Sequence, residues 1–256
     1  MTNSLLWLVG NWESPDFAPA ADWLSSHAEC RQIDPNSTEA GSDLAPAAVV
    51  VVQSRPGEFS KAEVAQLQAA AHGALVLVVA GPWCEGELRS GTPLTGVTRI
   101  EWRRWKCGFE AELAPLLQPA AERQQPQYSL PSDMQLIARN LRAVRRVKPE
   151  VDTAVVCTDS LPLFESLADS LSQFRIRARR AASDGDLLAS AKLILYDGWP
   201  QFECASAAAA MPSDGRKLLL LDWPRPADAQ RAKDAGIHEI ISLPFLLSDL
   251  ATEISA

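Results

Sequence analysis

The chain has 256 residues, of which 47% are hydrophobic and 22% charged, and its formal net charge is −8. This length fits one large domain or two of about 130 residues each, and the composition is typical of a soluble globular protein. The acidic balance argues against general binding to DNA or to anionic membranes.

The sequence predicts a cytoplasmic protein that makes no contact with a membrane. Its apolar runs are shorter than the roughly 20 residues that a membrane-spanning helix needs, and the N-terminus lacks the basic and apolar regions of a signal peptide. The 5 cysteines are widely spaced and form no C-x-x-C motif. We therefore expect reduced thiols, as in proteins of the cytoplasm.

The first half of the chain alternates short apolar runs with segments of helical periodicity. We expect strands at residues 4–10, 30–33, 47–52, 74–80 and 98–102, and helices at 17–27, 60–72 and 109–117. Ser60 and Glu63 have the spacing of a capping box at the start of the second helix. Residues 81–97 are rich in Gly and Pro and are expected to form a long loop.

The alternation repeats in the second half, after a segment rich in Pro and Gln at residues 119–131. We expect strands at 153–157, 175–178, 192–196, 218–221 and 238–242, and helices at 132–147, 161–173, 187–190, 203–210, 227–235 and 245–254. Alternating apolar strands and helices indicate parallel sheets covered on both faces. The predicted fold is therefore α/β, with two tandem flavodoxin-like, doubly wound, five-stranded parallel sheets. One domain covers residues 1–118, a linker 119–131, and the second domain 132–256, beginning with a linker helix.

The stretch Lys217–Glu253 has the clearest pattern in the chain: strand, helix, strand, helix, with Gly236 before the last strand and Pro-Phe after it. This ending resembles the receiver domain of bacterial response regulators, and the resemblance covers Val151–Ile254. It implies a receiver-like fold for the second half. It also puts Asp197, in LILYDGWP, at the place of the family's phosphoacceptor aspartate.

Three positions depart from the receiver pattern. Receivers have an acidic pair after the first strand, a Thr or Ser after the fourth, and a Lys before the Pro that follows the fifth. Here Thr158-Asp159-Ser160 supplies one carboxylate, and Asp222 and Leu243 replace the hydroxyl and the Lys. Phosphoryl transfer needs a metal and a cation to offset negative charge, so we expect no ordinary phosphorylation switch. In the first half Gln53 ends the third strand, which implies a receiver-like domain without an acidic pocket.

Three carboxylates follow strands of the second domain: Asp159, Asp197 and Asp222. Strand ends of a parallel sheet meet at one edge, where ligands bind in open α/β folds. Because Mg²⁺ prefers oxygen ligands, the three form a candidate Mg²⁺ site. Alternatively they are turn and cap residues, which Asp also favours. No other cofactor is expected, since the chain contains no complete catalytic or nucleotide-binding motif.

Four of the 8 tryptophans also follow strands: Trp12, Trp83, Trp199 and Trp223. Tryptophan is frequent at binding hot spots, so these residues are a candidate interaction surface. Alternatively each folds over the edge of its own sheet. We expect Trp199 and Trp223 to be buried, because Pro200 and Pro224 hold them close to the sheet, and Trp83 to be exposed.

These patterns favour a non-catalytic signalling or scaffold protein made of two degenerate receiver-like (pseudo-receiver) domains. It would act by contact with another protein or by self-association. The alternative is an enzyme, or a protein that binds a small ligand or metal, at the carboxyl edge of the second sheet. Nucleic-acid binding ranks last, because only residues 102–106 interleave tryptophan with basic side chains.

Overall fold

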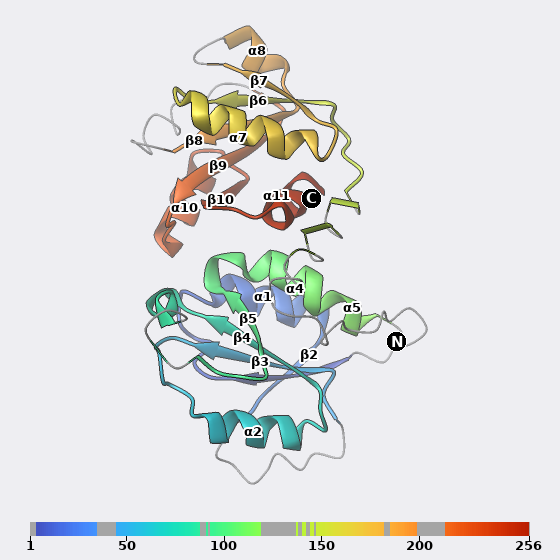
Figure 1. The fold of residues 1–256 in the computed structure, drawn as a ribbon, viewed down its shortest axis with the longest axis vertical. Coiled ribbons are helices and arrows are strands. Elements are labelled where there is room, and N and C mark those ends of the chain that lie inside the picture. The colour runs from blue at the N-terminus through green and yellow to red at the C-terminus, as the bar shows by residue number, and fades with distance from the viewer. Residues whose placement is uncertain are drawn as a thin grey trace. The chain divides into compact units, whose positions relative to one another are not determined.

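Two five-stranded parallel sheets form the framework of the protein in the computed structural model (Figure 1). The structure describes residues 4–34, 45–87, 91, 93–118, 137, 140–141, 144–145, 147–181, 185–198 and 213–255. The chain divides into two compact units, Met1–Pro126 and Gln127–Ala256. The division falls inside residues 119–131, the segment that the sequence predicts as a linker and that lies outside the described residues.

The strands of the first sheet are ordered β2-β1-β3-β4-β5. Their bounds are β1 (Leu5–Val9), β2 (Glu29–Gln32), β3 (Ala48–Gln53), β4 (Leu75–Ala80) and β5 (Thr98–Glu101). Every neighbouring pair is parallel, and this order is that of flavodoxin-like folds. Every residue of the central strand β3 is buried, as in a strand covered on both faces.

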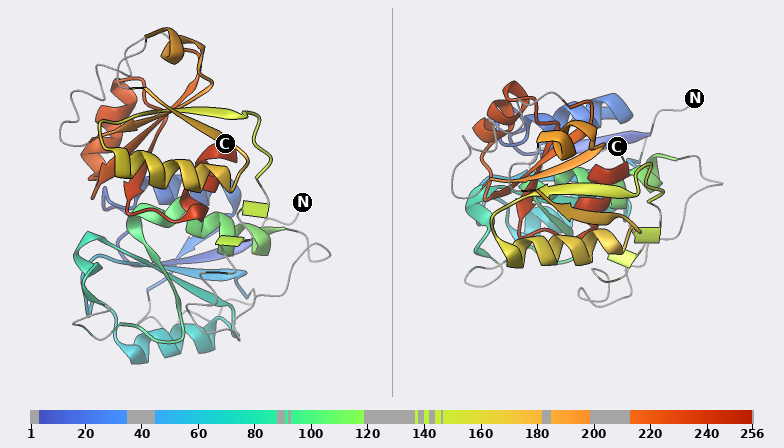
Figure 2. Two further views of the ribbon diagram at one scale, coloured as in Figure 1. Left: turned by 45° about the horizontal axis from the view of Figure 1, so that its top comes forward. Right: turned by 90° about the horizontal axis from the view of Figure 1, so that it is seen from above.

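Helices cover both faces of the first sheet. Helices α1 (Ala18–His27), α4 (Trp105–Glu112) and α5 (Ala114–Leu117) lie on one side, and α2 (Lys61–Ala70) on the other (Figure 1). The left view of Figure 2 shows the same layers, with α2 in cyan and α4 in green. Leu24 and Phe109 share one core with Val50, and Leu67 shares the other with Val51. Side chains that alternate along each strand therefore pack into two separate cores, one on each face of the sheet.

Local sequence signals set the ends of these helices. The Glu63 N–H donates to Ser60 Oγ at 3.2 Å, and the Ser60 N–H donates to Glu63 Oε2 at 2.7 Å, so the capping box is confirmed. The helix expected at 109–117 instead begins at Trp105, after the 3₁₀ helix η3 (Trp102–Arg104). It divides into α4 and α5 just before Pro115, because proline lacks the N–H that a continuous helix needs.

The second sheet repeats the topology of the first, with the order β10-β9-β8-β6-β7. Its strands are β6 (Thr153–Cys157), β7 (Arg177–Arg180), β8 (Leu193–Asp197), β9 (Arg216–Asp222) and β10 (Glu239–Leu243), all paired in parallel. The predicted fold class is confirmed. The weak second strand of this unit begins at Arg177, two residues later than the sequence predicts.

The helices of the second unit also form two layers. Helices α7 (Leu161–Ser172) and α11 (Leu247–Ser255) pack on one face, and α8 (Gly185–Ser190) and α10 (Pro226–Asp234) on the other. The helix expected at 203–210 and most of the one at 132–147 lie outside the described residues. None of the described helices has the length and apolar character needed to cross a membrane.

Candidate functional site

Asp197, which the sequence analysis placed at a phosphoacceptor-like position, ends the central strand β8 of the second sheet. Thr158, which follows β6, donates its hydroxyl to Asp197 Oδ2 at 2.6 Å. The Thr158 hydroxyl also accepts the Ser160 N–H at 3.0 Å, and Ser160 in turn caps α7 by accepting the Leu163 N–H at 3.3 Å. The carboxylate is therefore tied to the turn that starts α7.

Arg180, at the end of the edge strand β7, fixes the same turn. Its Nε donates to the Thr158 carbonyl at 3.0 Å, and its Nη2 to the Asp159 carbonyl at 2.6 Å. Both bonds go to backbone oxygens, so the guanidinium orients the loop rather than a carboxylate. The Asp159 residue itself is exposed.

The two other positions that the sequence analysis compared with receivers are Asp222 and Leu243. Asp222 ends β9 and is exposed, and it stands opposite Leu243 in the β9–β10 register. Leu243 packs against the core of the second unit. An apolar side chain therefore occupies the place where the receiver pattern has a cation.

The structure does not bring the three carboxylates of the candidate Mg²⁺ site together. In the part of the chain that the structure describes, which includes all three, no group of three or more His, Cys, Asp or Glu side chains is placed to hold a metal ion. Asp197 is engaged by Thr158 at 2.6 Å, whereas Asp159 and Asp222 are exposed at the ends of other strands. Adjacent strand ends bring backbones together at this edge, but these side chains do not converge.

Cys157 and Tyr196 lie side by side beneath this edge, opposite each other in the β6–β8 register. Burial raises the pKa of the Cys157 thiol to about 11. Burial and then the neighbouring Cys157 raise the pKa of Tyr196 to about 12. Both groups are neutral near pH 7, so neither is an activated nucleophile.

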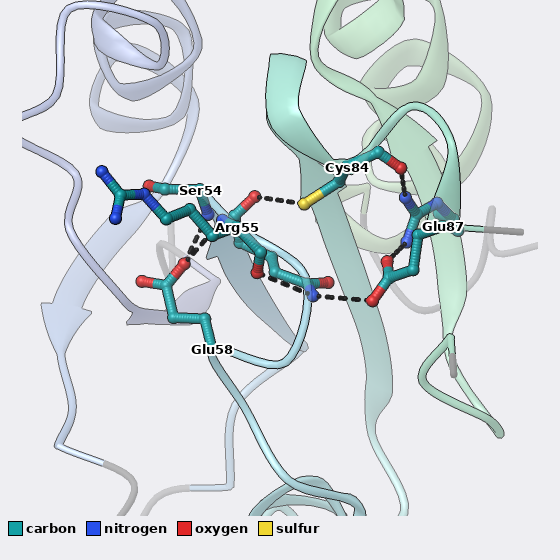
Figure 3. Close-up of polar contacts among 7 residues, drawn as sticks. Ser54, Arg55, Glu58, Cys84 and Glu87 are labelled. Atoms are coloured by element: carbon teal, nitrogen blue, oxygen red, sulfur yellow. Dashed lines mark hydrogen bonds and ion pairs between the residues drawn. The ribbon is translucent and has the colours of Figure 1, made fainter. Parts of the chain in front are cut away.

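The carboxyl edge of the first sheet carries a buried polar network that the sequence analysis missed. Gln53, the last residue of β3, is fully buried, and Glu87 is 3% exposed. Gln53 Nε2 donates to Glu87 Oε1 at 3.2 Å and to the Arg55 carbonyl at 3.1 Å. Glu87 also forms an ion pair with Arg99 of β5, with Nη1 and Oε2 2.7 Å apart (Figure 3).

Cys84 belongs to the same network. Its thiol donates to the Gln53 carbonyl at 3.4 Å, and its own carbonyl accepts Arg99 Nη2 at 2.8 Å (Figure 3). Burial, followed by the charge of Glu87, raises the pKa of this thiol to about 11 although Arg99 opposes the shift. Cys84 is therefore a structural thiol. It forms no disulfide, and neither do the other described cysteines, Cys30, Cys107 and Cys157.

Two further sets of contacts fix the loops at the carboxyl edge of the first sheet. Glu58 Oε2 accepts the N–H groups of Ser54 and Arg55, at 2.5 and 3.2 Å, and so fixes the turn after β3 (Figure 3). Arg103 forms ion pairs with Glu85 at 3.7 Å and with Glu101 at 3.5 Å. The loop after β4 is thus bonded to β3, β5 and η3. The sequence holds no short-range signal for this, because the partners are far apart along the chain.

The four tryptophans differ sharply in burial. Trp12 is 9% exposed and donates its indole N–H to the Val9 carbonyl at 3.2 Å. Trp83, in the 3₁₀ helix η2 (Pro82–Cys84), is 75% exposed, as expected. Trp223 is 56% exposed, so the prediction that it is buried is wrong: its neighbour Pro224 is buried instead. Trp199 lies outside the described residues.

The basic and aromatic segment at residues 102–106 is engaged within its own unit. Arg103 pairs with Glu85 and Glu101, and Arg104 pairs with Glu101 at 3.7 Å. Trp102 and Trp105 pack against the core. These side chains do not form the open stacking platform that single-stranded nucleic acid requires.

No protein-family model and no curated protein matches the chain. Among solved structures, an adenylate cyclase from Rhodopirellula baltica is 18% identical with a TM-score of 0.33, and the match covers 41% of this chain and 84% of the other. A response regulator protein from Burkholderia multivorans is 28% identical with a TM-score of 0.31, covering 39% and 89%. The C-terminal part of E. coli RcsC, with a linker region and phosphoreceiver domain, is 14% identical with a TM-score of 0.32, covering 98% and 90%. These scores assign the chain to no family.

Proposed function

We propose that this protein is a non-catalytic signalling or scaffold protein that acts through protein–protein contacts. The observation that carries the proposal is the exposure of Trp83 and Trp223, at 75% and 56%. Each follows the fourth strand of its unit, β4 or β9, so the two stand at equivalent places in the two sheets. We name Trp83 and Trp223 the edge tryptophans.

The backbone around each edge tryptophan supports a contact role. Trp83 precedes the fully buried Cys84, which is bonded to Gln53 and Arg99. Trp223 has a φ of 47° and lies between Asp222 and the buried Pro224. A bulky side chain in the left-handed region is a strained arrangement. Trp83 is therefore presented to solvent beside the buried Cys84, and Trp223 beside the buried Pro224. Buried neighbours of this kind restrict the backbone and so lower the entropy cost of binding.

The chemistry of the carboxyl edges supports a role without catalysis. Glu87 in the first unit is neutralised by Arg99 at 2.7 Å, and Asp197 in the second accepts the Thr158 hydroxyl at 2.6 Å. The two buried thiols with raised pKa, Cys84 and Cys157, are poor nucleophiles at neutral pH. The partner would be another protein or a second copy of this chain.

Affinity capture with matched variants tests the proposal. Wild type, Trp83→Ser, Trp223→Ser and the double variant are used as bait. Leu141→Ala is the control, because it removes an apolar side chain of similar exposure, 54%, that does not directly follow a strand. We expect a partner, or self-association measured by light scattering, that the tryptophan variants lose and Leu141→Ala keeps. Equal capture and an equal mass in solution for all baits would contradict the proposal.

A further inference from the structure

A cavity of about 710 Å³ lies in the second unit at the start of β6. It is lined by the segment before β6, the first residues of β6, the turn after α7, strand β7, and α8 with the residues that follow it. The helix α8, drawn beside β7 and β6 in Figure 1, has 6 residues, half the 12 of α7 on the opposite face. So short a helix covers only part of this face of the sheet. The volume is in the range of small-molecule sites, about 300–1,000 Å³.

Three cationic side chains line the cavity: Arg175, Arg179 and Lys192. Arg175 follows α7, Arg179 lies in β7, and Lys192 lies between α8 and β8. The side chains of all three lack a hydrogen bond or ion pair to any residue that the structure describes. Arg180, one residue beyond Arg179, differs in being bonded to two backbone carbonyls. Unpaired cations around a cavity of this size are a feature of anion-binding sites.

Arg175 occupies a position where glycine is the less strained choice. Its φ is 63°, and its N–H donates to the Ser172 carbonyl while the Ile176 N–H donates to Leu171. The end of α10 has the same pair of bonds, and there Gly236 takes the left-handed position with a φ of 79°. A strained arginine therefore lines the cavity at a position where the equivalent turn after α10 has glycine.

The remaining residues that line the cavity indicate which class of anion would bind there. Glu150 and Asp152 line it as well, and carboxylates accept hydrogen bonds from hydroxyl groups. Among the described residues of the lining, the apolar ones are aliphatic, with Val155 and Leu187, and none carries an aromatic ring for base stacking. We propose that this cavity binds a small hydroxylated organic anion, with its phosphate or carboxylate held by Arg175, Arg179 and Lys192. This site is independent of the edge tryptophans and goes beyond the proposed contact function.

Calorimetric titration of the full chain tests the site, with glycerol 3-phosphate, malate and inorganic phosphate as probes at matched ionic strength. Wild type is compared with Arg175→Gly and Arg179→Gln. Arg177→Gln is the matched control, because Arg177 lies on the same strand and is exposed but does not line the cavity. Chemical shifts of the Val155 and Lys192 amides show where the probe binds.

We expect saturable binding of at least one probe, about tenfold weaker in Arg175→Gly because one charge-assisted hydrogen bond is lost. The melting temperature of Arg175→Gly should be no lower than that of wild type, since glycine relieves the left-handed backbone. Arg177→Gln should bind as wild type does. The proposal is overturned if no probe binds saturably, if Arg175→Gly binds as tightly as wild type, or if Arg177→Gln loses as much affinity as the cavity variants.

Discussion

Gln53 and Asp197 occupy the same place in the two units, as the last residue of the central strand of each sheet, β3 or β8. Gln53 is fully buried and donates to Glu87 at 3.2 Å, whereas Asp197 is half-buried and accepts from Thr158 at 2.6 Å. A neutral amide in one unit thus corresponds to a carboxylate in the other. The two sheets share their topology but differ in the chemistry at their carboxyl edges.

Acetyl phosphate with Mg²⁺ should leave Asp197 unmodified. Phosphoryl transfer to a carboxylate is assisted by a cation and a metal, and the apolar Leu243 packs where the receiver pattern places the cation. Intact mass after incubation is the measurement. A stoichiometric phosphoryl adduct on wild type that Asp197→Asn lacks would show that this site is competent after all.

Removing Arg99 should destabilise the first unit by about 3 kcal/mol or more, because the Glu87 carboxylate would be left buried without its partner. The ion pair is short, 2.7 Å, and Glu87 is nearly inaccessible, with its side chain 2% exposed. Urea unfolding of Arg99→Met measures the loss.

The double variant Arg99→Met/Glu87→Gln is the control for that loss. It removes the buried charge, and the amide can still accept from or donate to Gln53, so most of the stability should return. If the double variant is as unstable as Arg99→Met alone, the cost comes from packing and not from the orphaned carboxylate.

The stability of the protein should fall as the pH rises from 9 toward 11. The thiols of Cys84 and Cys157 have folded-state pKa values of about 11, against 9.0 for the unperturbed group. The folded protein therefore holds these protons more tightly than the unfolded chain. Their stabilisation is complete below about pH 9 and is lost as the pH approaches the folded values.

Urea unfolding at a series of pH values measures this effect. In Cys84→Ala and Cys157→Ala the decline above about pH 9 should be shallower, because each variant lacks one of the shifted groups. Readings are best taken near or below pH 10, since Tyr196, with a pKa raised to about 12, also titrates at higher pH. If the stability of both variants depends on pH as that of wild type does, the two thiols do not cause the decline.

Local patterns predicted most of the fold. The apolar run at Leu218–Leu221 lies in β9, and the spacing of Ser60 and Glu63 produced the capping box. These features depend on neighbours a few residues away, which a sequence shows directly. The arginine-rich strand β7 was placed two residues too early, because a polar edge strand has no apolar run to mark its start.

The candidate sites were less predictable, because they depend on contacts across the chain. Gln53 bonds to Glu87, 34 residues away, and no motif links them. The carboxylates Asp159, Asp197 and Asp222 follow adjacent strands as predicted, yet no described metal-binding group includes them. Trp223 was expected to be buried by its neighbour Pro224, but in the left-handed conformation, with a φ of 47°, it is 56% exposed.

The edge tryptophans should contribute little to folding, in contrast to Trp12. Trp12 is 9% exposed within the core, so Trp12→Ala should cost about 3–5 kcal/mol. Trp83→Ala should cost less than about 1 kcal/mol. Trp223→Gly should leave stability unchanged or raise it by up to about 1 kcal/mol, because glycine accepts the left-handed conformation. Thermal and urea unfolding of the three variants check this order, and an unfolded Trp83→Ala would refute it.

The dissociation constant of the captured partner, or of the self-associated form, tests the proposed function most directly. It is measured for wild type, Trp83→Ala, Trp223→Gly and Leu141→Ala under one set of conditions. The account predicts that at least one edge-tryptophan variant binds more weakly by roughly 2 kcal/mol or more, with its melting temperature maintained and Leu141→Ala unchanged. Equal dissociation constants for wild type and both edge-tryptophan variants would contradict it.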